Sequence, residues 1–69
     1  MSYKRQKFMQ ALEARGVVVL REGGSHTIVG RPGGRPEPVP RHREINRITA
    51  RKIAKNLEIP WDQLEQDIR

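Results

Sequence analysis

Residues 16–30 read GVVVLREGGSHTIVG, a pattern that predicts a β-hairpin. The β-branched run Val17 to Leu20 is typical of a strand, and Ser25 to Gly30 supplies a second strand. A glycine pair between the two runs suits a tight turn. Gly16 suits the end of a preceding helix, because glycine adopts the left-handed backbone conformation at little cost.

Helices are expected on both sides of this hairpin. Residues 4–15 and 47–57 carry apolar side chains at helical spacing, and Asn46 or Thr49 could cap the second helix. Pro60 opens a third, short helix, because its ring suits the first helical position. The expected apolar faces are Phe8, Met9, Ala11 and Leu12, then Ala50, Ile53, Ala54 and Leu57, then Trp61, Leu64 and Ile68.

Residues 35–40 predict a third strand, and residues 41–45 a linking loop. Pro36, Pro38 and Pro40 withhold backbone donors at alternate positions, so this strand is expected at the edge of the sheet. The order predicts an α+β fold, with a three-stranded antiparallel sheet, helices on one of its faces and a short extra C-terminal helix. This α-β-β-β-α order is that of double-stranded-RNA-binding domains.

The length and composition narrow the class of protein. A chain of 69 residues predicts one domain with a small core, and the absence of cysteine excludes disulfides and thiolate metal sites. Two histidines cannot fill a zinc shell, and no apolar run approaches a membrane span or a signal peptide. We expect a soluble cytoplasmic protein with no metal or other cofactor. The large residues expected to be structural are Phe8, Met9, Leu12, Leu20, Ile28, Val39, Ile45, Ile53, Leu57, Ile59, Trp61, Leu64 and Ile68.

The charge of the chain points to a polyanionic partner. The net charge is +6, and residues 1–57 hold 13 Lys and Arg against four Glu, a net charge of +9, while residues 58–69 carry −3. Most of the cations are arginine, whose planar guanidinium suits phosphate. A basic body with an acidic tail therefore favours nucleic acid as the ligand.

His26 is the strongest catalytic candidate. Imidazole is the only side chain whose unperturbed pKa lies near neutrality, and RNA carries its own nucleophile, the 2′-hydroxyl. A base that removes this proton, or an acid that protonates the leaving 5′-oxygen, can cleave RNA without a metal. Arg21, Arg51 and Lys52 are candidates to stabilise the charge on the phosphate. The alternative is a surface histidine that hydrogen-bonds its own turn. Strict alternation groups His26 with Ile28, without deciding which face of the strand is buried.

Other polar residues have weaker claims. Ser25 is more typical of a turn hydroxyl than of a nucleophile, because no acidic third member is placed. His42 could be a second proton-transfer group, a phosphate contact or a helix cap, and a structural role is favoured. The polar face of residues 47–57 is either a ridge that contacts RNA phosphates or a solvated helix face; its cations are Arg47, Arg51, Lys52 and Lys55. Trp61 is expected to pack in the core or against a partner.

The order of these motifs resembles the HicA toxins of bacterial and archaeal toxin–antitoxin pairs. The family has a first helix that ends at glycine, a hydrophobic strand, an arginine and a glycine-serine-histidine turn, matched in order and spacing by Gly16, Val17 to Leu20, Arg21 and Gly24-Ser25-His26. Later family motifs are similar to Val39-Pro40-Arg41-His42, Glu44-Ile45, Thr49 and residues 51–59. The likeness covers about residues 5–60.

The resemblance implies a double-stranded-RNA-binding-like fold and an endoribonuclease that cleaves mRNA and stalls translation. The family's catalytic histidine maps onto His26, and a HicB-type antitoxin would cover it. We expect residues 1–69 to form a single HicA-like domain, monomeric when free, with an acidic helical tail at about 60–69. One alternative is a non-catalytic RNA-binding module. DNA binding is less favoured, because strands separate the two main helices, and a domain that binds an acidic protein is compatible with a toxin.

Overall fold

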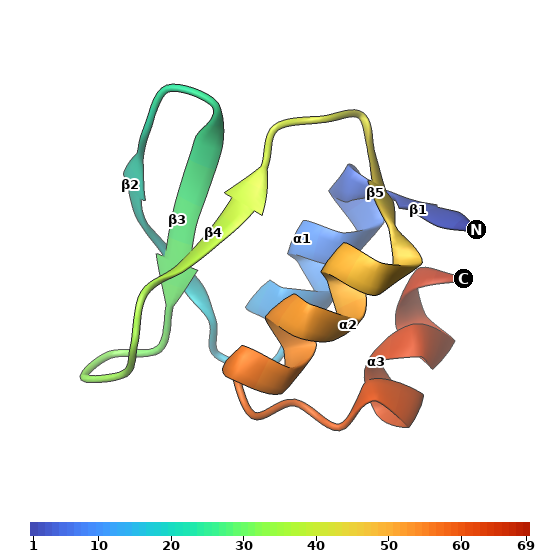
Figure 1. Cartoon of the computed structure of the whole chain (residues 1–69). Helices are drawn as coiled ribbons and strands as arrows, with labels where there is room; N and C mark the ends of the chain where they lie inside the picture. Colours follow the sequence, from blue (N-terminus) through green and yellow to red (C-terminus); the bar gives the residue numbers. More distant parts are fainter.

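The computed structural model describes residues 1–69 and confirms the α+β fold class (Figure 1). It contains a three-stranded and a two-stranded antiparallel sheet. Its order fits the α-β-β-β-α arrangement of double-stranded-RNA-binding domains, followed by the extra C-terminal helix. The elements are β1 (Ser2–Lys4), α1 (Arg5–Glu13), β2 (Val18–Glu22), β3 (His26–Gly30), β4 (Glu37–Pro40), β5 (Glu44–Asn46), α2 (Arg47–Asn56) and α3 (Trp61–Ile68).

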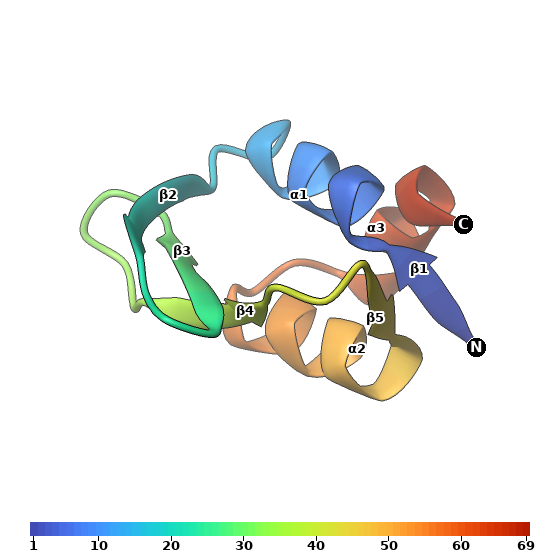
Figure 2. The ribbon, with the colours of Figure 1, turned by 90° about the horizontal axis from the view of Figure 1, so that it is seen from above.

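The larger sheet has the order β2-β3-β4 and is covered by helices on one face. Figure 2 shows α1 and α2 on the same side of this sheet. Thr27 and Val29 of β3 and Val39 of β4 are buried, so they form the inner face. Because side chains alternate along a strand, His26 and Ile28 lie on the outer face. The buried face of β3, which the sequence did not decide, is therefore the face of Thr27 and Val29.

α1 and α2 end in the same way but on different residues. Gly16, after α1, has φ +84°, and Glu58, after α2, has φ 59°, so both residues adopt the left-handed backbone conformation. The next residue's N–H then donates back to a carbonyl of the helix, the Schellman arrangement. The bonds are Val17 to Leu12 at 3.1 Å and Gly16 to Glu13 at 3.0 Å, then Ile59 to Ala54 at 2.8 Å and Glu58 to Lys55 at 3.0 Å.

The core lies between the sheet and the three helices. α2 begins at the predicted cap, where Asn46 Oδ1 accepts the backbone N–H of Thr49 at 2.8 Å. α3 is part of the core rather than a loose tail, because Leu64 and Ile68 are buried. The buried apolar residues are Tyr3, Phe8, Ala11, Leu12, Val17, Val29, Val39, Ile45, Ala50, Ile53, Ala54, Leu57, Ile59, Leu64 and Ile68. None of the helices is long and apolar enough to cross a membrane.

Two expectations about the fold were wrong. Leu20 and Ile28 were expected in the core, but Leu20 is 48% exposed on the edge strand β2, and Ile28 is half-exposed on the outer face of β3, beyond the cover of the helices. Residues 41–45 were expected as a loop, but β5 pairs antiparallel with the unpredicted strand β1, for example Tyr3 opposite Ile45. Both strands are too short to show a local pattern. The position of β4 at the opposite edge, with its prolines, is confirmed.

Candidate active site

The β2–β3 hairpin holds His26 as the first residue of β3, directly after the turn. The backbone N–H of Gly23 donates to the carbonyl oxygen of His26 at 2.8 Å and closes this turn. A Cβ atom on Gly23 would come within 3.2 Å of the same oxygen, so glycine permits the close approach. On the other side, the register places His26 opposite Pro40 of β4. The backbone of His26 is therefore fixed from both neighbouring strands.

The imidazole of His26 is exposed and free of protein partners. No side-chain hydrogen bond and no ion pair of the chain includes it. Its turn is closed through the backbone carbonyl, so the alternative of a ring bonded to its own turn is wrong. Both ring nitrogens are open to a substrate that approaches the outer face of the sheet.

A polar network lies on the inner side of the same hairpin. Thr27, which follows His26, is the one buried polar residue and is 1% exposed. Its hydroxyl accepts from Arg5 Nη2 at 2.6 Å and donates to Glu22 Oε1 at 2.8 Å. Arg41 Nη2 donates to the same Glu22 oxygen at 2.6 Å. The network therefore connects α1, the hairpin and the segment after β4.

Charge and hydrogen bonding in this network act on one carboxyl group. The Thr27 hydroxyl, and after it the Arg41 guanidinium, hold the pKa of Glu22 below its ordinary value. The backbone N–H of Arg41 also donates to Ser25 O at 3.2 Å, which ties the β4–β5 loop to the turn before His26. These contacts hold the turn end of the hairpin, and Arg5, Glu22, Thr27 and Arg41 line an open hollow of about 510 Å³. No local sequence pattern marks this role of Arg5, because only the folded chain brings it to β3.

Arg21 is the predicted cation that shares a face with His26. The register places Arg21 opposite Ile28, so its side chain belongs to the outer face, and His26 is its diagonal neighbour on β3. Diagonal neighbours in such pairs lie about 7–8 Å apart, within reach of a long side chain. Arg21 is exposed and has no ion-pair partner, so its charge is available to an anion on this face.

The cations of α2 form a separate surface. Arg51, Lys52 and Lys55 are exposed and, with Ile59 and Trp61, line an open groove of about 540 Å³. Its lining residues come from α2, from the connection between α2 and α3, and from the first residue of α3, and none belongs to the β2–β3 hairpin. Neither Arg51 nor Lys52 contacts a residue of the β2–β3 hairpin through a hydrogen bond or an ion pair, so their assistance to His26 stays a prediction.

Arg47, and Trp61 at the groove, have partners within the protein. Arg47, the fourth predicted cation of α2, lies 3.9 Å from Glu65 through its Nε, so its charge is partly neutralised. Trp61 is half-buried and packs edge-to-face on Tyr3, with ring centroids 5.8 Å apart. Its buried Nε1 has no hydrogen-bond partner. This packing fits the expected structural role of Trp61, while its remaining exposed surface borders the groove.

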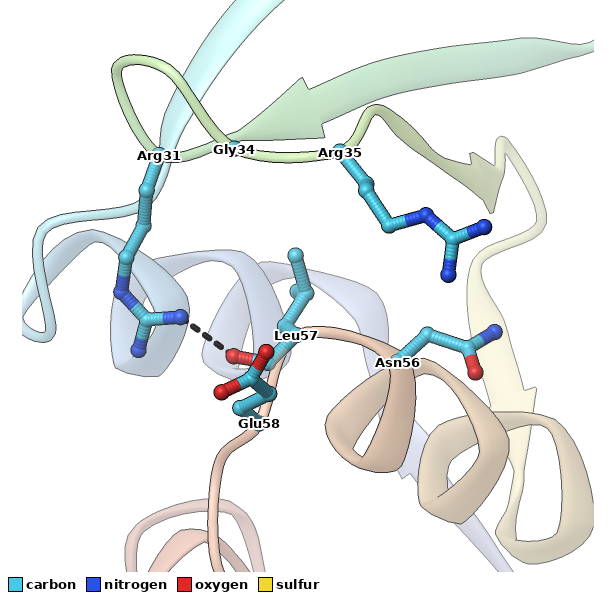
Figure 3. Close-up of a pocket in the computed structure, with 6 residues that line it drawn as sticks. All are labelled: Arg31, Gly34, Arg35, Asn56, Leu57 and Glu58. Carbon is cyan, nitrogen blue, oxygen red and sulfur yellow. Dashed lines mark hydrogen bonds between the residues drawn. The ribbon is translucent and has the colours of Figure 1, made fainter.

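Figure 3 shows another hollow, of about 180 Å³, between the β3–β4 turn and the end of α2. Arg31 reaches across it and donates a hydrogen bond to the carbonyl oxygen of Leu57. The bond gives a partner to a carbonyl oxygen at the C-terminal end of α2, and a positive charge is favourable at this end of a helix. We assign this hollow a structural role in holding the β3–β4 turn against the helix.

The remaining sequence candidates stay isolated. Ser25 is exposed and its side chain has no acidic or basic partner, as expected for a turn hydroxyl. His42 is exposed in the β4–β5 loop, and its alternative role as a helix cap is wrong, because Asn46 caps α2. No three His, Cys, Asp or Glu side chains stand close enough together to hold a metal ion.

Comparison with known proteins gives one match. A family model described as the HicA toxin of bacterial toxin–antitoxin systems matches residues 5–59. The matched range begins at the first residue of α1 and ends just before α3, so it includes the whole hairpin and α2. No curated protein and no solved structure matched the chain.

Proposed function

The chain belongs to the HicA family of toxins from toxin–antitoxin systems, and on this basis we propose that it is a metal-independent endoribonuclease that cleaves mRNA through His26. Cleavage of mRNA in the cytoplasm would inhibit translation. The observation that supports this proposal is the exposed imidazole of His26, on a rigid hairpin beside Arg21 and without a competing protein partner.

The proposed reaction uses the nucleophile of the substrate. Neutral His26 accepts the proton of a ribose 2′-hydroxyl, and the 2′-oxygen attacks the adjacent phosphorus. The bond from phosphorus to the 5′-oxygen breaks, and the leaving oxygen takes up a proton from imidazolium or water. The products are a 2′,3′-cyclic phosphate and a free 5′-hydroxyl. Arg21 would stabilise the negative charge that grows on the phosphate oxygens.

We propose that the α2 groove binds a more distant part of the same RNA. Arg51, Lys52 and Lys55 present three charges that suit backbone phosphates, and Arg47 contributes less because of Glu65. The groove is lined by residues of α2 and of the start of α3, whereas His26 lies on the β2–β3 hairpin, so a polymer is the kind of ligand that would contact both. This arrangement favours mRNA over a mononucleotide substrate.

The family also implies an antitoxin partner. We propose that a HicB-type antitoxin covers His26 and so blocks the catalytic surface. The outer face of the sheet has no cover from the chain itself, which leaves it accessible to such a protein.

His26→Ala tests the catalytic assignment. Incubation of the wild type with end-labelled mRNA in excess chelator should yield fragments with cyclic phosphate ends, and His26→Ala should cleave about 10²- to 10⁴-fold more slowly with an unchanged circular dichroism spectrum. His42→Ala removes the other exposed histidine and serves as the matched control. Equal cleavage by His26→Ala and wild type would overturn the assignment.

The second candidate function is a non-catalytic RNA-binding module, favoured by the α2 cations, whose groove includes no residue of the β2–β3 hairpin. It predicts binding whose logarithmic affinity falls with salt at a slope of about −0.7 per phosphate contact, with no fragments. The chelator experiment separates the two functions, because binding without any cleavage supports only the module.

A further inference from the structure

The free edge of β2 differs from the other edge of the sheet. β2 and β4 are both edge strands, since β3 lies between them. β4 carries Pro38 and Pro40, which lack N–H donors and so discourage pairing with another strand. β2 has no proline, and all five of its residues are exposed, while a bulge interrupts its pairing with β3 between Val19 and Arg21. Proline therefore blocks strand addition at one edge of the sheet, whereas the other edge keeps all its backbone donors.

The open edge is also apolar. Val18, Val19 and Leu20 are 44%, 46% and 48% exposed and follow one another along β2. Val19 is opposite the inward Val29, whereas a Cβ on the outward-facing Gly30 would meet Leu20 Cδ1 at 3.1 Å. β2 thus presents apolar side chains on both faces of the sheet, beside unpaired backbone groups. Such a strand is a template for another strand.

The positive charge of the chain indicates which kind of ligand would bind at the free edge of β2. Residues 1–57 hold 13 Lys and Arg against four Glu; on β2 itself Arg21 has no ion-pair partner, whereas Glu22 is paired with Arg41. A second copy of the chain would bring its own net charge of +6 to this surface, whereas an acidic segment would be attracted. The complementary ligand is an extended protein segment in which carboxylates alternate with apolar side chains.

We propose that β2 is the docking edge for an extended acidic segment of the antitoxin, which adds to the sheet as a fourth strand. The proposal deepens the proposed function, because it rests on an antitoxin that blocks His26. A strand on β2 would place side chains beside Arg21, on the face that carries His26 one strand away. Bound there, the segment would neutralise Arg21 and obstruct RNA at the outer face.

A synthetic peptide tests this docking without the antitoxin. The probe has about nine residues of alternating glutamate and valine with blocked ends, and its control carries N-methyl groups at alternate amides, which prevent strand pairing. Titration into ¹⁵N-labelled protein should shift the amide resonances of β2 most strongly. The N-methylated control should bind at least about tenfold more weakly.

Variants of the protein give an independent readout. Leu20→Lys or Val18→Lys should weaken peptide binding at least about tenfold although each adds a charge that attracts the peptide. Ile48→Lys makes the same change at an apolar side chain of α2 that is 83% exposed, and should leave binding unchanged. The peptide should inhibit RNA cleavage by the wild type and by Ile48→Lys, but not by Leu20→Lys, which should cleave normally.

Three results would overturn the proposal. They are equal peptide binding by Leu20→Lys and wild type, resonance shifts confined to α2, or a dimer of the free protein in sedimentation that Leu20→Lys abolishes. The last result would assign the edge to a second copy of the chain. Absence of RNA cleavage would overturn the proposed nuclease activity and leave the peptide-binding arms to decide the docking edge on their own.

Discussion

Replacement of Thr27 by valine should destabilise the protein by about 1.5–2 kcal/mol. Valine matches threonine in shape, so the change removes the hydroxyl without opening a cavity. The main loss is the 2.6 Å bond from the Arg5 guanidinium, and a hydrogen bond to a charged group contributes about 1.5–3 kcal/mol. We take the lower part of this range because Arg5 Nε keeps its 3.0 Å bond to Pro40 O. The bond to the exposed Glu22 carboxylate adds only a small, pH-dependent part to this loss, since water can replace most of its lost donor.

Urea and thermal unfolding measure this loss. For a domain of this size, the expected change lowers Tm by about 6–16 °C. Thr49→Val is the matched control, because Thr49 is half-buried and its hydroxyl makes no hydrogen bond. That variant should stay within about 0.5 kcal/mol of wild type. A Thr27→Val protein as stable as Thr49→Val would refute the network as a source of stability.

The same pair of proteins has a pH signature. The Thr27 hydroxyl contributes first to the lowering of the Glu22 pKa from its ordinary value of 4.5, and Arg41 contributes second. A lowered pKa in the folded state stabilises the protein above the ordinary value, and this contribution is lost as the pH falls through the lowered pKa. The stability difference between wild type and Thr27→Val should therefore be larger at pH 7 than at strongly acidic pH. A constant difference would contradict the Thr27–Glu22 contact.

Four further predictions concern the helix ends and the buried tyrosine. Glu58→Gly should raise the free energy of unfolding by about 0.5–1 kcal/mol, because Glu58 has φ 59° and glycine adopts this conformation without steric cost. Gly16→Ala places a side chain at φ +84° and should lower the free energy of unfolding by about 1–2 kcal/mol, although the space around the new Cβ is open. Asn46→Ala should cost about 1 kcal/mol in urea unfolding, since it removes the cap of α2. Burial, and then the 2.7 Å bond to Glu65, raise the pKa of Tyr3. This raised pKa stabilises the folded protein below the ordinary tyrosine value, and the stabilisation should be lost as the pH rises through the raised pKa. Tyr3→Phe should lack this loss in unfolding measured at alkaline pH.

The helices were predictable from the sequence because their signals are local. Residues 47–57 repeat apolar side chains every three or four positions, and Asn46 marks the start of α2 with a side chain that accepts a backbone N–H. The glycine at 16 ends α1 as predicted. Glu58 gave no such signal, because a glutamate in the left-handed conformation is held there by the packing of Ile59 and not by its own preference.

The faces of β3 could not be predicted, because two residues there reverse the usual rule. Thr27 is polar and buried, while Ile28 is apolar and half-exposed. Burial of Thr27 depends on Arg5, which is 22 positions away in the chain and meets it only after folding. The pairing of β1 with β5 has the same origin, as it joins segments more than 40 residues apart. Non-local contacts of this kind leave no periodic pattern in the sequence.

The candidate site also divides into features that a local pattern predicts and features that depend on folding. His26 was predictable as an exposed residue because the glycines and the hairpin that carry it are adjacent in the chain. Whether a cation of α2 reaches His26 depends on how the helix packs in the folded chain, and no local pattern of the sequence decides it. Arg21 lies in the same hairpin as His26, so its place beside His26 follows from the register of the two strands.

The hairpin thus combines two surfaces that exclude each other when occupied. Its outer face carries His26 and Arg21, which we propose contact RNA, and its free edge carries Val18 and Leu20, which we propose contact a protein strand. Only one strand separates the two, so a ligand on the edge would overlap any RNA that reaches Arg21. Inhibition by this route requires no rearrangement of the toxin, because steric exclusion and loss of one positive charge act on the folded hairpin as it stands. The polar network through Thr27 ties that hairpin to α1 and to the segment after β4, and both the proposed catalytic geometry and the proposed docking edge depend on this placement of the hairpin.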